Sequence, residues 1–218
     1  MWRYSLLGRA YDAISLERPL YRRPRAELLG RLDLRPGWTV VDLGCGTGLN
    51  LPGLVQQVGP AGRVIGVDAS ASMLAAARRR VRRAGWRSVR LVPGDAADLL
   101  PLLDGLRLPG GVDAVVATFV LSLLDDDAPV WRAVDELARD RPLRVGLADL
   151  GEPAAAPRPL RPVLATLTRV GGGDPRRRPW EALATRAADT WTGAWFGGHV
   201  HVAVGTCAPP GRPVRPPG

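Results

Sequence analysis

Hydrophobic positions through the middle of the chain alternate between the spacing of strands and that of helices. Short runs rich in β-branched residues are found at 39–43, 63–67, 89–92, 112–117 and 143–150. Between them, apolar residues recur as on one face of a helix over 51–58, 70–84 and 127–137. Strands that alternate with helices through short connections predict an α/β fold, whose parallel sheet is covered by helices on both faces. We expect Gly59 and Gly85 to end the first two helices and Asp127 to cap the third.

The pattern changes after Leu150. Residues 151–162 are rich in proline and alanine and predict a loop, and helices are expected at 160–170 and 179–188. Two strand-like runs then follow at 190–195 and 199–206, and Gly197-Gly198 between them suits a tight hairpin. This hairpin is expected to add an antiparallel edge to the sheet.

Length and composition indicate one main domain with short terminal segments. The chain has 218 residues, of which 46% are hydrophobic, so it can bury a sizeable core. We expect a helical segment at 1–34, the main domain at 35–206 and a disordered tail rich in proline and arginine at 207–218. No apolar run is long enough to span a membrane, and the amino end lacks a secretory signal. Two cysteines, Cys45 and Cys207, make no disulfide framework, so we expect a cytoplasmic protein.

The charge is strongly basic, at +9, which raises nucleic acid or an anionic membrane surface as a partner. All 30 basic residues are arginine, however, and the chain is rich in alanine, glycine and proline. This bias is typical of GC-rich codon usage, which favours reading most of the arginines as a solvated surface.

The most informative stretch is a glycine loop between the first strand and the first helix. Glycines at 44, 46 and 48 let the backbone turn sharply and let a ligand approach it closely. A dinucleotide-binding loop would need a third glycine at position 49, which is Leu49, so a nicotinamide oxidoreductase is disfavoured. Asp42, two residues before the first glycine, would oppose a pyrophosphate and suits a ligand with an ammonium or sulfonium group.

Two further acids follow the next two strands. Asp68 ends the second strand, where a carboxylate can accept both hydroxyls of a ribose. Asp95 follows the third strand and can accept an amine from an adenine edge, with the Ala96 N–H beside it. Each acid alone could simply cap the helix that follows it. The carboxyl ends of parallel strands lie along one edge of the sheet, however, and open α/β sheets bind ligands there, so the three acids together favour a binding site.

These residues resemble the motifs of class I S-adenosylmethionine-dependent methyltransferases. The resemblance covers residues from about 20 to 150 and implies a Rossmann-like, mostly parallel sheet of seven strands that ends in an antiparallel hairpin strand. It also implies that residues 35–206 form the domain that binds S-adenosylmethionine and that residues 1–34 form a lid over it. The methionine part of the cofactor would contact Asp42, Gly44, Cys45, Gly46 and Gly48.

The resemblance implies roles for further residues. Asp68 would hold the ribose, Ala69 and Met73 would flank the adenine, and Asp95 with Ala96 would take its edge. Thr118 and Phe119, just past the fourth strand, would form the floor beneath the reacting methyl group. Tyr11 would be a contact from the lid.

Within that family the chain is similar to the ubiquinone/menaquinone-biosynthesis group and related lipid or small-molecule enzymes. The likeness rests on Tyr11-Asp12, on 46–52 and on 118–122, although the usual Pro-Gly-Gly turn before the fifth strand is absent. A small, hydrophobic or lipid-like acceptor is therefore expected. An RNA methyltransferase and a cofactor-binding protein without catalysis stay open as alternatives, and the oligomeric state is open too.

The sequence shows no clear general base and no metal site. His199 and His201 are expected to share one exposed face of a strand, opposite Val200, Val202 and Val204 on the core side. Two histidines without a cysteine or carboxylate cluster make no metal site. Four aromatic residues can line an apolar acceptor pocket or simply pack in the core: Trp180, Trp191, Trp195 and Phe196.

Overall fold

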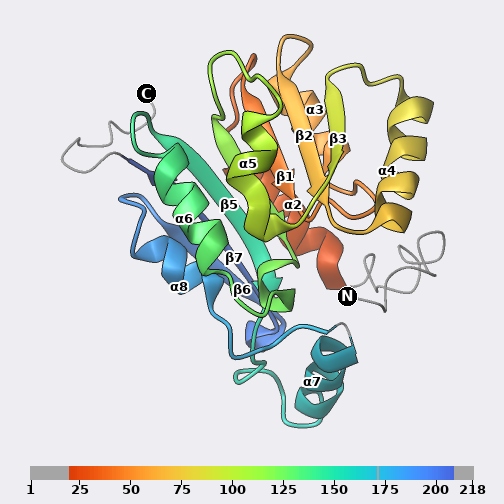
Figure 1. Ribbon diagram of the computed structural model, residues 1–218. Coiled ribbons are helices and arrows are strands. Elements are labelled where there is room, and N and C mark those ends of the chain that lie inside the picture. The colour runs from red at the N-terminus through yellow and green to blue at the C-terminus, as the bar shows by residue number, and fades with distance from the viewer. Residues whose placement is uncertain (1–19, 171, 209–218) are drawn as a thin grey trace.

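The computed structural model describes residues 20–170 and 172–208, and a seven-stranded sheet runs through it (Figure 1). The strand order is β3-β2-β1-β4-β5-β7-β6. The strands are β1 (Thr39–Leu43), β2 (Arg63–Asp68), β3 (Val89–Pro93), β4 (Ala114–Thr118), β5 (Leu143–Leu150), β6 (Trp191–Trp195) and β7 (Val200–Cys207). The α/β fold expected from the sequence is confirmed: the five strands from β3 to β5 in this order are parallel.

The carboxyl-terminal hairpin forms one edge of the sheet, as expected. β7 pairs antiparallel with both β5 and β6, so it lies inside the sheet and β6 is the outermost strand. Its position explains why both faces of β7 are apolar: Val202 and Val204 pack on one side and Ala203 and Cys207 on the other.

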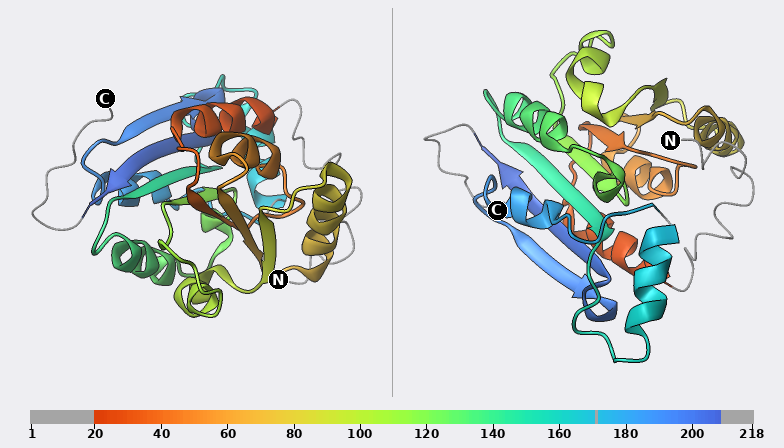
Figure 2. Two further views of the ribbon diagram at one scale, coloured as in Figure 1. Left: turned by 90° about the horizontal axis from the view of Figure 1, so that it is seen from above. Right: turned by 60° about the horizontal axis from the view of Figure 1, so that its bottom comes forward.

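Helices cover both faces of the sheet (Figure 2). On one face lie α2 (Arg22–Arg31), α3 (Leu51–Val58) and α4 (Ala71–Ala84), and on the other α5 (Leu99–Asp104), α6 (Ala128–Leu137) and α8 (Pro179–Ala184). The remaining helix, α7 (Arg161–Val170), projects beyond the carboxyl ends of β4 and β5 (Figures 1 and 2). No helix in the described ranges combines the length and apolarity that crossing a membrane requires.

Local signals set several helix ends. Ser70 caps α4 by accepting the Met73 N–H at 3.4 Å, and Gly85 ends it in the left-handed conformation at φ +68°. Asp127 precedes α6 but does not cap it: its carboxylate accepts the indole N–H of Trp131 at 3.0 Å and pairs with Arg177. The expected Asp127 cap is therefore wrong, because two side-chain donors take the carboxylate that a cap would need.

The segment between β3 and β4 holds two short elements that the hydrophobic pattern did not predict. A 3₁₀ turn, η3 (Ala96–Asp98), leads directly into α5, which is six residues long and contains Pro101. So short an element completes too few turns to show a helical period. Further along, β4 begins two residues later than expected and α8 ends at Ala184 instead of 188.

The helix α2 packs closely against β5 and β7. Leu28 and Leu32 are fully buried against β5, where a side chain at Gly146 would come within 2.8 Å of both. Arg144 of β5 donates to the carbonyls of Arg31 and Leu32 and so satisfies the carboxyl end of the helix. This anchor matters because α2 also supplies residues to the site described below.

We expect Leu28→Ala to lower the free energy of unfolding by about 2–5 kcal/mol, because it leaves a cavity between α2 and the sheet. Chemical denaturation followed by circular dichroism measures this loss. Leu160, which is 51% exposed, provides the matched control, and Leu160→Ala should change stability by less than about 0.5 kcal/mol. Equal effects of the two variants would contradict the packing described for α2.

Candidate functional site

A buried carboxylate lies at the carboxyl end of β1, the central strand of the parallel part of the sheet. Asp42 is fully buried and aligned with Gly66 of β2 and Val116 of β4. Its Oδ1 accepts a hydrogen bond from Asn50 Nδ2 at 2.6 Å, while Oδ2 has no partner within the described residues. Burial raises the pKa of Asp42 to about 7, although the Asn50 hydrogen bond and the charge of Arg25 oppose the rise.

Asn50 joins this carboxylate to two other elements. Its amide nitrogen also donates to Thr118 Oγ1 at 3.1 Å, at the end of β4. Arg25 of α2 donates to both Asn50 Oδ1 and Thr118 Oγ1, at 2.6 and 3.0 Å. The four side chains Arg25, Asp42, Asn50 and Thr118 therefore form one hydrogen-bonded network, which we call the Asn50 network.

The glycine loop wraps past this network towards β2. The Cys45 N–H donates to the carbonyl of Val67, and the Gly46 N–H donates to Asp68 Oδ2 at 2.8 Å. Gly46 has φ +54°, and a Cβ there would meet nothing within 4 Å, so the loop backbone is open on that side. Gly44 differs, because a side chain at that position would collide with Val120. Cys45 and Gly48 are buried.

Asp68 lies at the end of β2, next to the glycine loop. Its two carboxylate oxygens each accept one backbone N–H, from Ser70 at 2.8 Å and from Gly46. A carboxylate has about four acceptor positions, so each oxygen can accept one further hydrogen bond. Burial raises the pKa of Asp68 above its ordinary value. Ala69 is exposed beside it and Met73 is buried in the first turn of α4.

Asp95 follows β3, the strand that pairs with β2. The residue before it, Gly94, connects this segment to the end of β2. The Gly94 N–H donates to the backbone carbonyl of Asp68, while Asp95 Oδ1 accepts the Ala97 N–H at 3.0 Å and so caps η3. Ala96 is buried. The structure thus places the three acids at the ends of neighbouring strands, with one oxygen of Asp95 used in a helix cap.

An aromatic and histidine cluster lies beyond β4. Phe119 has an unusual φ of +56°, and the ring of Tyr21 packs against it at 4.8 Å between centroids. The Tyr21 hydroxyl lies 3.2 Å from His199 Nε2, and Arg25 lies over the Phe119 ring. The expectation that His199 is exposed on a strand is wrong: it precedes β7 and is fully buried, and burial lowers its pKa to about 4.

The other residues considered from the sequence are dispersed. His201 stacks on Trp180 at 3.8 Å and is half-buried, so the expected exposed pair of histidines does not form. Trp180 packs on one face of the sheet and Trp191 and Trp195 on the other, so the tryptophans do not line one pocket. Tyr11 lies outside the described residues. Across residues 20–170 and 172–208, no cluster of histidine, cysteine and acidic residues could hold a metal ion.

Three residues near the site were not named as site residues by the sequence analysis: Tyr21, Arg25 and Asn50. Asn50 is the only asparagine of the chain and stands two residues after the last glycine of the loop, a signal that could have drawn attention to it. Arg25 carried no such signal among 30 arginines, because only the packing of α2 brings it to the loop.

We expect Asp42→Asn to stabilise the protein at neutral and alkaline pH when no ligand is added. The carboxyl group has a pKa of about 7 in the native state against an ordinary value of 3.8, so native stability is lost as the pH rises through this interval. An amide removes that loss. Thermal unfolding should therefore show a gain in Tm over the unmutated protein that is larger at about pH 8 than at about pH 5.

Asp140→Asn, the same change at an exposed acid, is the matched control and should change Tm little at either pH. A constant difference for Asp42→Asn as well would show that Asp42 titrates as an ordinary carboxylate.

Comparison with known proteins agrees with this arrangement. Residues 40–140 match a family described as "Methyltransferase domain". The chain is 37% identical over 155 residues to trans-aconitate 2-methyltransferase of Methylobacterium radiotolerans, covering 62% of this chain and 56% of that protein. It is 36% identical over 88 residues to demethylmenaquinone methyltransferase of Bacillus cytotoxicus, covering 40% and 36%. The chain thus matches only about half, or less, of these relatives' length.

A solved structure supports the fold over a longer stretch. Phosphoethanolamine N-methyltransferase 2 of Haemonchus contortus, in complex with S-adenosyl-L-methionine, superposes with a TM-score of 0.63. The superposition covers 93% of this chain and 56% of that one. Because the sequence identity is only 13%, the likeness shows the fold alone. Residues 40–140 thus match a methyltransferase domain, and the superposition shows that the fold of such an enzyme extends over most of the chain.

Proposed function

We propose that this protein binds S-adenosylmethionine at the glycine loop and transfers its methyl group to a small acceptor. The observation that carries the proposal is the unpartnered, buried Oδ2 of Asp42 beside a glycine loop that is open at Gly46. A buried acceptor without a partner is costly, and a cationic ligand group would remove that cost. The match of residues 40–140 to a methyltransferase domain supports the same proposal.

The residues at the strand ends fit the parts of this cofactor. Asp42 would bind near the positively charged methionine part, and the same charge would favour the ionised form of a carboxyl whose pKa is about 7. Asp68 offers one further acceptor position on each oxygen, which suits the two hydroxyls of a ribose. Asp95 and Ala96 would contact the adenine edge, with Ala69 and Met73 beside the ring.

The helix α2 would contribute from the other side. Arg25 lies in the Asn50 network and over Phe119, where its guanidinium would attract the carboxylate of the methionine part. Thr118 and Phe119 would form the floor of the site. Residues 1–34 would act as the lid, in which Tyr11 stays a prediction.

Chemistry at this site needs alignment more than acid–base groups. When bound, S-adenosylmethionine supplies a methyl group made electrophilic by the sulfonium. The protein has to hold an acceptor lone pair in line with that methyl and exclude water. Tyr21 packs against Phe119 and hydrogen-bonds to a neutral His199, so it is the side chain we propose for contact with the acceptor.

The relatives and the aromatic residues near the site support a small organic acceptor. Relatives named for trans-aconitate and demethylmenaquinone methylation suggest a small organic acceptor for this chain too. The aromatic rings of Tyr21 and Phe119 favour an apolar or lipid-like part in that acceptor. Its identity, and whether carbon, nitrogen or oxygen is methylated, is for the experiment below to establish.

We expect Asp68→Ala to weaken binding of S-adenosylmethionine by at least about 100-fold, because two charge-assisted hydrogen bonds to the ribose are lost. Isothermal titration calorimetry measures the change. Asp68→Asn, which keeps acceptor oxygen for one backbone N–H, should lose less. Asp140→Ala removes an exposed acid and should bind as the unmutated protein does. Unchanged affinity in a folded Asp68→Ala variant would overturn the ribose assignment.

Incubation with methyl-labelled S-adenosylmethionine and a fractionated cell extract should place the label in small apolar metabolites or lipids. The Asp68→Ala variant serves as the inactive control. Label in RNA would instead identify the acceptor as nucleic acid. Binding of the cofactor without transfer to any fraction would show a protein that binds S-adenosylmethionine but does not catalyse.

A further inference from the structure

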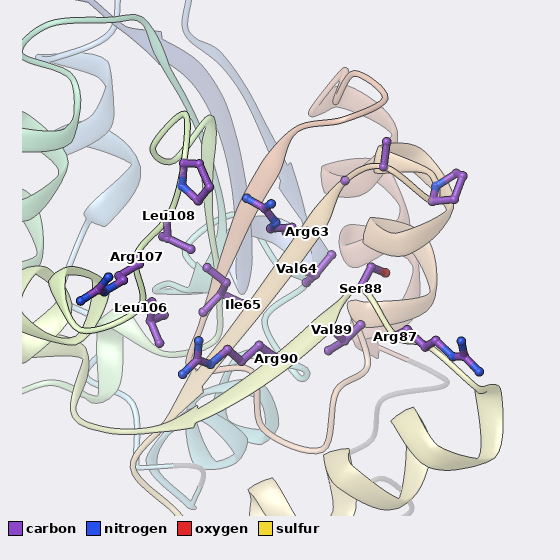
Figure 3. A pocket seen from close by; sticks show the side chains of 14 residues that line it. Arg63, Val64, Ile65, Arg87, Ser88, Val89, Arg90, Leu106, Arg107 and Leu108 are labelled. Carbon is purple, nitrogen blue, oxygen red and sulfur yellow. The ribbon is translucent and has the colours of Figure 1, made fainter.

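A basic groove lies at the opposite end of the sheet from the candidate cofactor site. It has a volume of about 610 Å³ and is formed at the amino ends of β2 and β3 and by the loop between α5 and β4 (Figure 3). Arg63 begins β2 and Asp68 ends it, so the groove and the ribose-binding acid are about 17 Å apart along one strand. The groove is therefore a separate site.

Four arginines line this groove: Arg63, Arg87, Arg90 and Arg107. Within the described residues, no hydrogen bond or ion pair engages any of their side chains. Arg63 and Arg90 project from the same face of neighbouring strands, because Arg90 aligns with Ile65 and Arg63 stands two residues earlier. Like charges so placed repel one another, and an anion between them would relieve that repulsion.

Nearby acids do not neutralise the cluster. Asp113, in the segment that leads into β4, is already engaged by Arg141 and by the Thr39 N–H. Asp104 is exposed at the end of α5, three residues from Arg107, and offers one negative charge against the three positive charges of Arg63, Arg90 and Arg107. The groove consequently carries a net positive charge.

The groove also has an apolar wall. Leu106 and Leu108 lie between the arginines in Figure 3 and are half-buried, and Ile65 is buried behind them. In Figure 3, Arg63 and Arg90 lie on one side of these three side chains and Arg107 on the other, whereas Arg87 points away on the far side of β3. An apolar wall with charged groups around it suits an organic moiety that carries anionic groups.

We propose that this groove binds a ligand with two or more linked phosphate groups and an organic part that packs on Leu106 and Leu108. Guanidinium groups bind phosphate through paired hydrogen bonds, and a phosphate presents oxygens in several directions, so arginines from separate segments can engage one phosphate chain. The volume of about 610 Å³ matches a nucleotide-sized ligand. The phosphates can belong to a free nucleotide or to a nucleic acid end.

Calorimetric titration at low ionic strength tests the proposal with GTP, inorganic tripolyphosphate and a short oligouridylate as probes. S-adenosylhomocysteine is kept at saturating concentration so that the candidate cofactor site is filled. We expect GTP to bind more tightly than tripolyphosphate, because only GTP has a part for the apolar wall. Preference for the oligouridylate over GTP would assign the phosphates to nucleic acid.

The double variant Arg63→Gln/Arg90→Gln should weaken GTP binding by at least about 100-fold, since each guanidinium contributes about tenfold or more. Arg132→Gln, at an exposed arginine of α6, is the matched control and should bind normally. Both variants should melt as the unmutated protein does. Failure of all three probes to bind, binding that the double variant leaves unchanged, or equally tight binding of citrate would overturn the proposal.

Discussion

The site depends on one unfavourable feature, a carboxylate buried at the end of the central strand. Asp42 has no contact with solvent, yet one of its oxygens lacks a partner in the described residues. Burial on this scale pushes the carboxyl group towards its neutral form, which is why its pKa lies near 7. The ionised Asp42 carboxylate is unfavourable in the protein alone but would become favourable with a cation beside it. The burial of Asp42 therefore explains both its cost in stability and its suitability for the proposed function.

Hydrogen bonds from neighbouring residues reduce the cost of burying Asp42, and the packing of α2 holds those residues in place. Asn50 donates to one Asp42 oxygen, and Arg25 holds the Asn50 side chain by its carbonyl oxygen. Arg25 can reach this point because Leu28, one turn further along α2, is buried against the sheet. Packing of the apolar face of α2 thus positions the charged side chain of Arg25. A defect in that packing would displace Arg25 and so disturb the Asn50 network beside the glycine loop.

The sequence predicted the parts of the molecule that depend on local pattern. Five strand runs of the parallel sheet, the Gly85 helix end and the hairpin around Gly197 were visible because period, turn residues and β-branched content agree there. The burial of His199 was not visible in the sequence, because its neighbours Tyr21 and Thr168 are 178 and 31 residues away along the chain. Asp127 failed as a cap for a similar reason, since Arg177, distant in sequence, competes for its carboxylate.

Charged side chains on the central and outer parallel strands differ between the two ends of those strands, which bears on how the net charge of the chain should be interpreted. A chain with a net charge of +9 is a poor general environment for a sulfonium cation. The acids Asp42 and Asp68 lie at the carboxyl ends of the strands, however, while Arg63 and Arg90 lie near their amino ends. The two ends are about 17 Å apart along β2, so the charges at each end act mainly on their own surroundings. The net charge of the chain therefore says little about the candidate cofactor site. The same sheet can carry the proposed site for a cationic cofactor at one end and the proposed site for an anionic ligand at the other.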